Sequence, residues 1–122
     1  MTEQDIEQLA IEKLQTLGYR YLYGPDISPD GERPERRSYA DVILTQRLQS
    51  AIDHLNPDIP PDARMQAFQE ISTIASPDLI NNNERFHNFL TNGIDVEFQK
   101  EGLTRGDKVW LVDFEHPENN EF

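Results

Sequence analysis

The period of the hydrophobic pattern changes once along this chain, at Gly93, and this change limits the folds that the chain can adopt. Before Gly93, apolar residues recur every three or four positions, which is typical of helices with one buried face. After Gly93, Ile94, Val96 and Phe98 alternate with polar residues, which indicates a half-buried strand. The sequence therefore predicts an α+β fold in which four N-terminal helices are followed by a β-hairpin.

The first predicted helix spans residues 3–17 and has one apolar face. Thr2 is expected to cap its start, with Asp5 three residues later as a weak capping box. Gly18 is expected to end it in a left-handed conformation. The residues of the apolar face, which we expect to be buried, are Ile6, Leu9, Ala10, Leu14 and Leu17.

Three further helices are predicted before the change of period. The second spans residues 38–56, the third runs from Pro60 to the residue before Pro77, and the fourth spans residues 78–92. The residues expected to face the core are Leu44, Leu48, Ala51, Ile52 and Leu55 on the second helix, Met65, Phe68 and Ile71 on the third, and Phe86, Phe89 and Leu90 on the fourth.

The hairpin is predicted to have a loose turn at residues 101–107 and a second strand at residues 108–114. The run VWLV, residues 109–112, is apolar on both faces, as in a central strand. Two strands alone are marginally stable and leave two open edges. We therefore expect either a larger sheet or a homodimer formed through an unpaired strand edge.

A long loop is predicted at residues 24–37, and it carries the main concentration of basic residues, Arg33, Arg36 and Arg37. These arginines either contact DNA phosphates or a partner domain, or balance charge in an acidic chain. The aromatic residues Tyr19, Tyr21, Tyr23 and Trp110 are most simply interpreted as core.

The chain is strongly acidic, with 23 acidic and 11 basic residues and a net charge of −12. Such a surface repels phosphate, which argues against DNA binding by this chain alone through counterion release. The charge suits a carboxylate metal site, a basic protein partner or simple solubility, and a solvated surface is the favoured interpretation.

Several classes of protein are disfavoured by composition. The chain has no cysteine, which excludes disulfides and thiolate metal sites and fits a reducing cytoplasm. No apolar run approaches the length of a membrane span, and the N-terminus lacks the pattern of a signal peptide. We therefore expect a cytoplasmic protein that does not contact a membrane.

Four segments and one acid together carry a resemblance to a known family. They are Glu7, LQTLGY at residues 14–19, SYADVILTQRLQSAIDHLNP at 38–57, NNNERFHNFLTNGIDVEF at 81–98 and VWLVDFEHPENNEF at 109–122. In this order and spacing they resemble the N-terminal segment of the R subunit (HsdR) of type I restriction–modification enzymes. The similarity covers nearly the whole chain.

The resemblance implies a nuclease domain of the PD-(D/E)xK class followed by an ATP-driven motor. The intact subunit would require Mg²⁺ and ATP, act on DNA, and assemble with modification and specificity subunits. In this nuclease class, two carboxylates hold Mg²⁺ and a Lys helps to activate the attacking water. The domain of residues 1–122 is thus expected to be an incomplete part of such a nuclease.

The catalytic Asp or Glu two residues before a Lys is missing from the sequence. The residues two positions before Lys13, Lys100 and Lys108 are an Ile, a Phe and a Gly. We therefore expect residues 1–122 to stop short of the catalytic motif. The fragment itself is expected to be inactive and to bind neither Mg²⁺ nor ATP.

Two acids are candidate site residues. By resemblance, Glu7 is an acid on the first helix that assists the metal or its waters; the alternative is a surface Glu among other acids. Asp113 either reaches the same cleft or caps the turn before Pro117, and the capping role is favoured. His54, His87 and His116 lack metal-ligand spacing, so no metal site is predicted.

A second function remains open from charge alone. An acidic, non-catalytic interaction protein can mimic DNA and occupy a basic groove on a partner. Such a mimic needs carboxylates arranged along one face. The acids of this chain are scattered through every predicted element and mixed with Arg, which favours the nuclease fragment.

Overall fold

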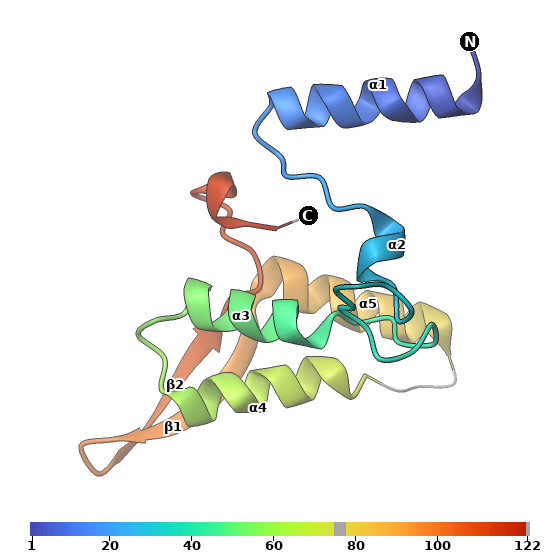
Figure 1. Ribbon diagram of the computed structural model, residues 1–122. Coiled ribbons are helices and arrows are strands. Elements are labelled where there is room, and N and C mark those ends of the chain that lie inside the picture. The colour runs from blue at the N-terminus through green and yellow to red at the C-terminus, as the bar shows by residue number, and fades with distance from the viewer. Residues whose placement is uncertain (75–77, 122) are drawn as a thin grey trace. The chain divides into compact units, whose positions relative to one another are not determined.

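The computed structural model describes residues 1–74 and 78–121, and its elements follow the predicted order, with helices first and a hairpin after them (Figure 1). The chain divides into two compact units, Met1–Val42 and Ile43–Phe122, which we call the first and second units. The described elements are α1 (Glu3–Thr16), α2 (Gly24–Ile27), α3 (Thr45–Leu55), α4 (Pro61–Ser72), α5 (Leu79–Asn92), β1 (Ile94–Lys100), β2 (Leu103–Val109) and the 3₁₀ helix η1 (Pro117–Asn119). The α+β class is confirmed.

In the first unit, α1 has the predicted caps but not the predicted burial. The Asp5 amide donates to Thr2 Oγ1 at 3.2 Å, and Asp5 Oδ2 accepts from the Thr2 amide at 2.8 Å. Gly18 is left-handed, with φ +99°. However, no residue of α1 is buried, and Leu17 is 76% exposed. Within the first unit, the expected buried apolar face is therefore not formed, because periodicity shows that a helix has an apolar face but not which residues cover it.

The segment between α1 and α3 is more ordered than the predicted loop. Residues Gly24–Ile27 form α2, and the Arg33 and Glu35 amides donate back to its Asp26 and Ile27 carbonyls at 2.8 and 3.0 Å. A Cβ at Gly31 would collide with the Pro25 and Asp26 carbonyl oxygens, so only glycine fits this close approach. The unbroken loop at 24–37 is therefore corrected to a short helix with a folded turn.

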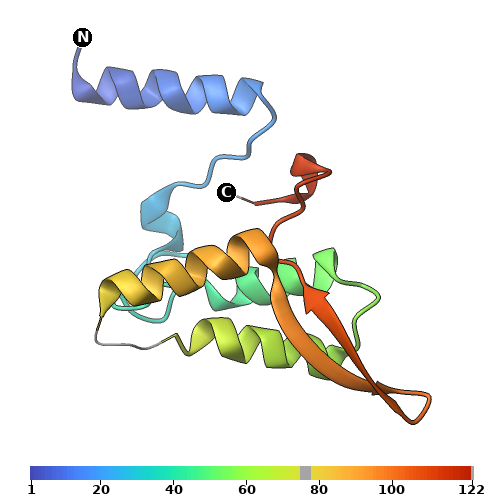
Figure 2. The ribbon, with the colours of Figure 1, turned by 180° about the vertical axis from the view of Figure 1, so that it is seen from behind.

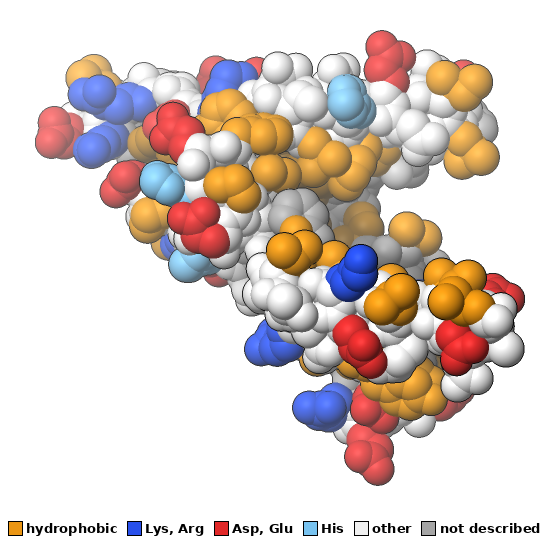
Figure 3. All heavy atoms as spheres, turned by 90° about the horizontal axis from the view of Figure 1, so that it is seen from above, with side chains coloured by type: hydrophobic (Ala, Val, Ile, Leu, Met, Phe, Trp, Pro, Cys, Tyr) orange, Lys and Arg blue, Asp and Glu red, His pale blue; other side chains and the backbone are white. Residues whose placement is uncertain are grey.

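Two other expectations, on the start of the second helix and on the burial of four aromatic residues, are also corrected. The second helix begins at Thr45 and not at residue 38, because Ser38 Oγ accepts from the Ala40 amide at 3.1 Å and holds a local turn. The aromatic residues expected in the core are exposed at the surface, by 46%, 45%, 55% and 38% for Tyr19, Tyr21, Tyr23 and Trp110. Hydrophobic side chains also occupy much of the face seen in Figure 3.

The core lies in the second unit, between the helices and the hairpin. Helices α3 and α4 form an antiparallel pair, and α4 packs on β1 (Figures 1 and 2). Helix α5 leads directly into β1 through Gly93, whose φ is +74°. The buried apolar residues are Ile52, Ile59, Ala63, Ala67, Ile71, Ile94, Val96 and Val109.

The buried faces of α4 and α5 differ in part from the prediction. On α4, the small residues Ala63 and Ala67 face the core, whereas Met65 is 41% exposed. Two alanines four positions apart let the helix approach the strand closely. On α5, Phe89 packs against the core but Phe86 is 41% exposed. Helix α4 ends at Ser72 with Thr73 as its C-cap, before Pro77 as predicted; residues 75–77 themselves lie outside the described residues.

The hairpin turn is much tighter than predicted. Lys100 pairs with Leu103, and only Glu101 and Gly102 separate the strands, with φ +54° and +76°. Two left-handed residues in succession suit the right-handed twist of a hairpin. The loose turn at 101–107 and the second strand at 108–114 were therefore wrong. The strand ends at Val109, and only the first two positions of the predicted strand belong to it.

No helix within residues 1–74 and 78–121 has the length and hydrophobicity needed to cross a bilayer.

Candidate functional site

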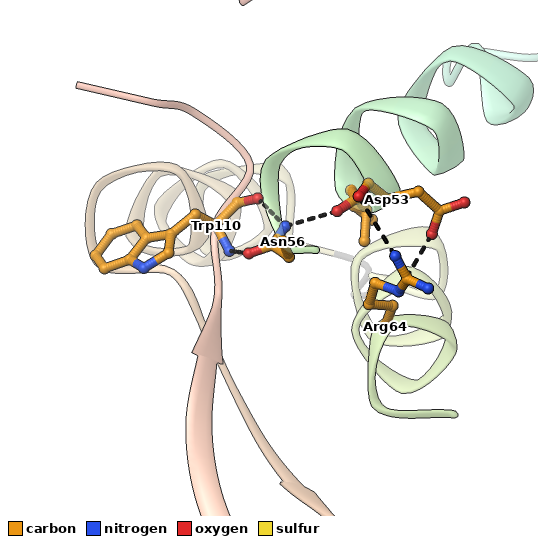
Figure 4. A network of polar contacts seen from close by, with 5 residues as sticks. Asp53, Asn56, Arg64 and Trp110 are labelled. Carbon is orange, nitrogen blue, oxygen red and sulfur yellow. Dashed lines mark hydrogen bonds and ion pairs between the residues drawn. The ribbon is translucent and has the colours of Figure 1, made fainter. Parts of the chain in front are cut away.

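Asn56 joins the end of α3 to the segment that follows β2 (Figure 4). Its Nδ2 donates to the Ile52 and Trp110 carbonyl oxygens, both at 2.8 Å, and its Oδ1 accepts from the Trp110 amide at 2.7 Å. The residue is only 4% exposed. The amide side chain thus bonds the backbone of Trp110 as a neighbouring strand would, and it holds the chain where β2 ends.

The local sequence explains why an asparagine occupies this place. Asn56 is the C-cap of α3, with φ −130° and ψ 57°, and the following Pro57 cannot extend the helix. A side chain with one donor group and one acceptor group can bond both backbone groups of a facing residue. Here that residue is Trp110, which leaves no buried polar atom of Asn56 without a partner.

Asp113 organises the turn that follows. Its Oδ1 accepts from the Glu115 and His116 amides at 3.0 Å each, and its Oδ2 accepts from Asn119 Nδ2 at 3.0 Å. The hydrogen bond from the Asn119 side chain, followed by the bond from the His116 amide, lowers the pKa of Asp113 below its ordinary value. The favoured prediction, that Asp113 caps this turn, agrees with these bonds.

A second asparagine holds the backbone of Asp113. Asn120 Oδ1 accepts from the Asp113 amide at 2.8 Å, and Asn120 Nδ2 donates to the Asp113 carbonyl at 2.9 Å. Asn56 and Asn120 therefore act alike, each bonding the N–H and C=O of one residue in the segment 110–113. Side-chain amides, and not a neighbouring strand, therefore bond the backbone of Trp110 and Asp113.

A small hollow lies between α3 and α4. Its walls include Ile52, Met65 and Phe68, and its volume is about 140 Å³. Arg64 lies beside it, with Nη1 3.3 Å from the Asp53 carbonyl and Nε 3.5 Å from Asp53 Oδ1. Pockets for small ligands are typically about 300–1,000 Å³, so this hollow is too small to hold a nucleotide.

The predicted site residue Glu7 lies on the exposed surface of α1. Within the first unit, its carboxylate accepts no hydrogen bond from a described residue, whereas the nearby Glu12 accepts one from Gln8. Its role as an assisting acid therefore stays a prediction. Among residues 1–74 and 78–121, no group of three or more His, Asp or Glu side chains could hold a metal ion.

The three predicted arginines lie in one folded segment of the first unit, and two of them point at local acceptors. Arg33 Nη2 lies 3.9 Å from Asp26 Oδ2. Arg36 Nη1 donates to the Asp41 carbonyl at 3.3 Å, and its guanidinium lies over the ring of Tyr39. Arg37 uses its backbone amide to bond Asp41 Oδ2. Arg33 thus lies near a carboxylate, Arg36 contacts a backbone carbonyl and an aromatic ring, and the side chain of Arg37 is exposed. Both interpretations of the arginines, contact with DNA or a partner domain and charge balancing, stay predictions.

Sequence reasoning missed Asn56 and Asn120 as structural residues. Asn56 precedes Pro57, a pair that predicts a helix end and nothing more. Its partner Trp110 lies 54 positions away, so no local pattern could identify the bond. Asn120 lies in an Asn-Asn pair that reads as an ordinary polar turn.

Comparison with known proteins identifies a family and two relatives. The sequence model of a family described as "Type I restriction enzyme R protein N terminus" matches residues 1–122. The type I restriction enzyme HindI endonuclease subunit of Haemophilus influenzae is 34% identical over 122 residues, which are 100% of this chain and 12% of that protein. A provisionally named type I restriction enzyme MjaIXP endonuclease subunit of Methanocaldococcus jannaschii is 35% identical over 117 residues, which are 96% of this chain and 11% of that protein.

The chain therefore spans a small part, 12% and 11%, of the length of these relatives. No solved structure matches the chain significantly.

Proposed function

The chain belongs to the family of N-terminal regions of type I restriction enzyme R proteins, and we propose from this that it is the scaffold at the start of a DNA endonuclease subunit. The observation that carries the proposal is the family match over residues 1–122 in a chain with no acid two positions before any of its three lysines. In this proposal the chain is a structural part of the nuclease, and the catalytic acids and lysine lie elsewhere in the subunit.

The intact subunit is proposed to be a PD-(D/E)xK nuclease that depends on Mg²⁺ and is driven by ATP. The residues described here do not fit a Mg²⁺ site. Asp113 directs both carboxylate oxygens at N–H donors, and a metal would have to displace them. The sequence also has no Gly-Lys pair, which a phosphate-binding P-loop requires. We therefore propose that the metal and ATP sites lie in other parts of the subunit.

The proposed role of these residues is to hold a hairpin and the segment after it in a fixed position. Ile94, Val96 and Val109 anchor the base of the hairpin on α4. Asn56 then fixes Trp110, and Asp113 with Asn120 fixes the turn that follows. The partners of the intact subunit are proposed to be DNA and the modification and specificity subunits.

The proposal is tested by a nuclease assay on purified residues 1–122 with supercoiled plasmid, Mg²⁺ and ATP. We expect no nicking or linearisation above a no-protein control, because the acids and lysine that accelerate hydrolysis are missing. The matched arm is the intact subunit with its modification and specificity subunits, which should cleave the same plasmid. Cleavage by residues 1–122 that persists through further purification and is abolished by EDTA would overturn the proposal.

The charge layout does not favour the alternative of a DNA mimic. Acidic and basic side chains are interspersed on the face seen in Figure 3. Some acids are already paired with cations of the same chain, as in Asp95 with Lys108 at 2.9 Å and Glu121 with Arg47 at 3.0 Å. A mimic would bind a basic partner with an affinity that falls steeply with salt, and a pull-down at two ionic strengths distinguishes the two functions.

A further inference from the structure

The outer edge of β2 is a free strand edge within the described residues. The sheet has two strands in the order β1-β2, so no third strand of residues 1–74 and 78–121 pairs with it. Every residue of β2 except Val109 is exposed. Figures 1 and 2 show the hairpin extending away from α3 and α4, so these helices do not cover its far end.

The register of the hairpin determines which backbone groups this edge presents. Lys100 and Leu103 flank a two-residue turn, and such a closing pair exchanges its hydrogen bonds within the hairpin. Alternate residues from Leu103 onward therefore bond to β1, and the residues between them point their N–H and C=O groups outward. The outward residues are Thr104, Gly106 and Lys108.

Two hydrogen bonds agree with this assignment. The Lys108 amide donates to its neighbour's side chain, Asp107 Oδ1, at 2.7 Å, as an amide outside the ladder can. The next outward residue, Trp110, gives both backbone groups to the side chain of Asn56. The edge is thus closed by Asn56 at Trp110 and open at Gly106 and Thr104.

We propose that this edge pairs with the same edge of a second copy of the chain, antiparallel and centred on Gly106. In this register the outward residues face one another, as the ladder requires. Arg105 lies opposite the partner's Asp107, and Asp107 lies opposite the partner's Arg105. Leu103 in turn lies opposite the partner's Val109. The sequence LTRGDKV is therefore complementary in charge to itself when reversed.

Repulsion between like charges disfavours the two neighbouring registers, which also bring the outward-pointing backbone groups of the two strands opposite one another. Centring the pair on Arg105 sets two arginines directly opposite, and centring it on Asp107 sets two aspartates opposite. Like charges at directly opposed positions destabilise a sheet, whereas opposite charges stabilise it. At the Gly106 centre there is no side chain, and glycine in a strand permits close backbone approach.

The length of the pairing matches the strand. All seven residues of β2 take part, and the bond from Asn56 to Trp110 ends the free edge one position later. Pairing requires one exchange of partners. Asp107 releases the Lys108 amide to the ladder and accepts the partner's Arg105 guanidinium in its place. The proposal is argued from β2 and Asn56 and concerns residues 1–122, in which no described strand covers this edge.

The test is sedimentation velocity on residues 1–122 over a wide concentration range near physiological ionic strength, where salt screens the net charge of −12. Wild type is expected to show a reversible monomer–dimer equilibrium. Arg105→Asp and Asp107→Arg should each weaken self-association by at least about tenfold, because two attractive pairs become repulsive. An equimolar mixture of the two variants should dimerise again, since each supplies the charges that the other lacks.

Lys100→Asp is the matched control, because it changes net charge as Arg105→Asp does but lies on β1. It should dimerise as wild type does. Circular dichroism of each variant checks that it is folded, and recovery in the mixture shows that folding was not lost. A wild type that stays monomeric at every concentration would overturn the proposal. So would variants that self-associate as wild type does, or a mixture that shows no recovery.

Amide hydrogen exchange identifies the edge itself. The Gly106 amide should exchange more slowly as the dimer forms, whereas the Glu101 amide in the turn should not change. Protection of Gly106 in a monomer would show that residues of the same chain cover the edge, and this would also contradict a second copy as its occupant.

Discussion

The first and second units are stabilised by different kinds of interaction. The first unit, Met1–Val42, contains a capped 14-residue helix and a folded turn, but no residue described in it is buried. The second unit contains all the buried apolar residues described, and its helices and hairpin meet over them. Local hydrogen bonds are therefore enough to specify elements, whereas the core depends on contacts between segments far apart in the sequence.

The largest expected effect comes from removing a core side chain of the second unit. Ile94, the first residue of β1, is fully buried where the hairpin packs on α4, so Ile94→Ala should lower the free energy of unfolding by about 2–5 kcal/mol. Urea unfolding followed by fluorescence of Trp110, the single tryptophan, measures this directly. The matched control is Ile80→Ala, since Ile80 is 76% exposed. An equal effect of the two changes would contradict the placement of the core.

The next effect tests the polar link between α3 and the end of β2. Asn56→Ala leaves the backbone groups of Trp110 without their partner and should cost about 1–3 kcal/mol of stability in the second unit. The same urea experiment measures it, with Asn83→Ala on the exposed surface of α5 as the control. If Asn56→Ala unfolds at the wild-type midpoint, the bond does not hold the segment in solution.

A smaller, local effect is expected in the first unit. Thr2→Ala removes the cap of α1 and should destabilise that helix by about 1 kcal/mol. Carbon chemical shifts of residues 3–16 measure the loss of helix, and Trp110 fluorescence should show an unchanged unfolding midpoint. Thr16→Ala in the last turn of α1 is the control and should keep the helix. A shifted midpoint in Thr2→Ala would show that the two units do not differ as described.

The smallest effect is on pH dependence. Hydrogen bonds from the Thr2 amide and hydroxyl lower the pKa of Asp5, and bonds from Asn119 and the His116 amide lower the pKa of Asp113. Each carboxylate therefore contributes stability above its ordinary pKa of 3.8 and loses it as pH falls through the lower folded value. An NMR titration below pH 3.8 should show α1 losing its cap with Asp5, and the turn at 113–119 opening with Asp113. Titration of either group above that value would contradict these contacts.

The parts of the fold that the sequence predicted correctly are those set by neighbouring residues. The cap at Thr2, the left-handed Gly18, the end of the last helix before Gly93, and the alternation along β1 are all local patterns. The hairpin turn was misjudged because Glu101 adopts φ +54°, which side chains rarely do, so its sequence does not resemble a two-residue turn.

Contacts between distant residues could not be predicted in this way. The helical period of α4 suggested Met65 as a core residue, but packing on β1 selected the alanines instead. The bond from Asn56 to Trp110 joins segments 54 positions apart. For the candidate site, the capping role of Asp113 followed from its place before a turn. The role of Glu7 came from resemblance and that of the arginines from their concentration on a predicted loop, and both stay predictions.

The most direct test of the contrast between the two units is native-state amide hydrogen exchange on residues 1–122. We predict that the amides of Ile52, Ala67 and Ile71 exchange only through global unfolding of the second unit, because these residues are buried. The amides of α1 should exchange far faster, through fraying of a helix with no buried residue. Protection in α1 equal to that of Ala67 would contradict the account.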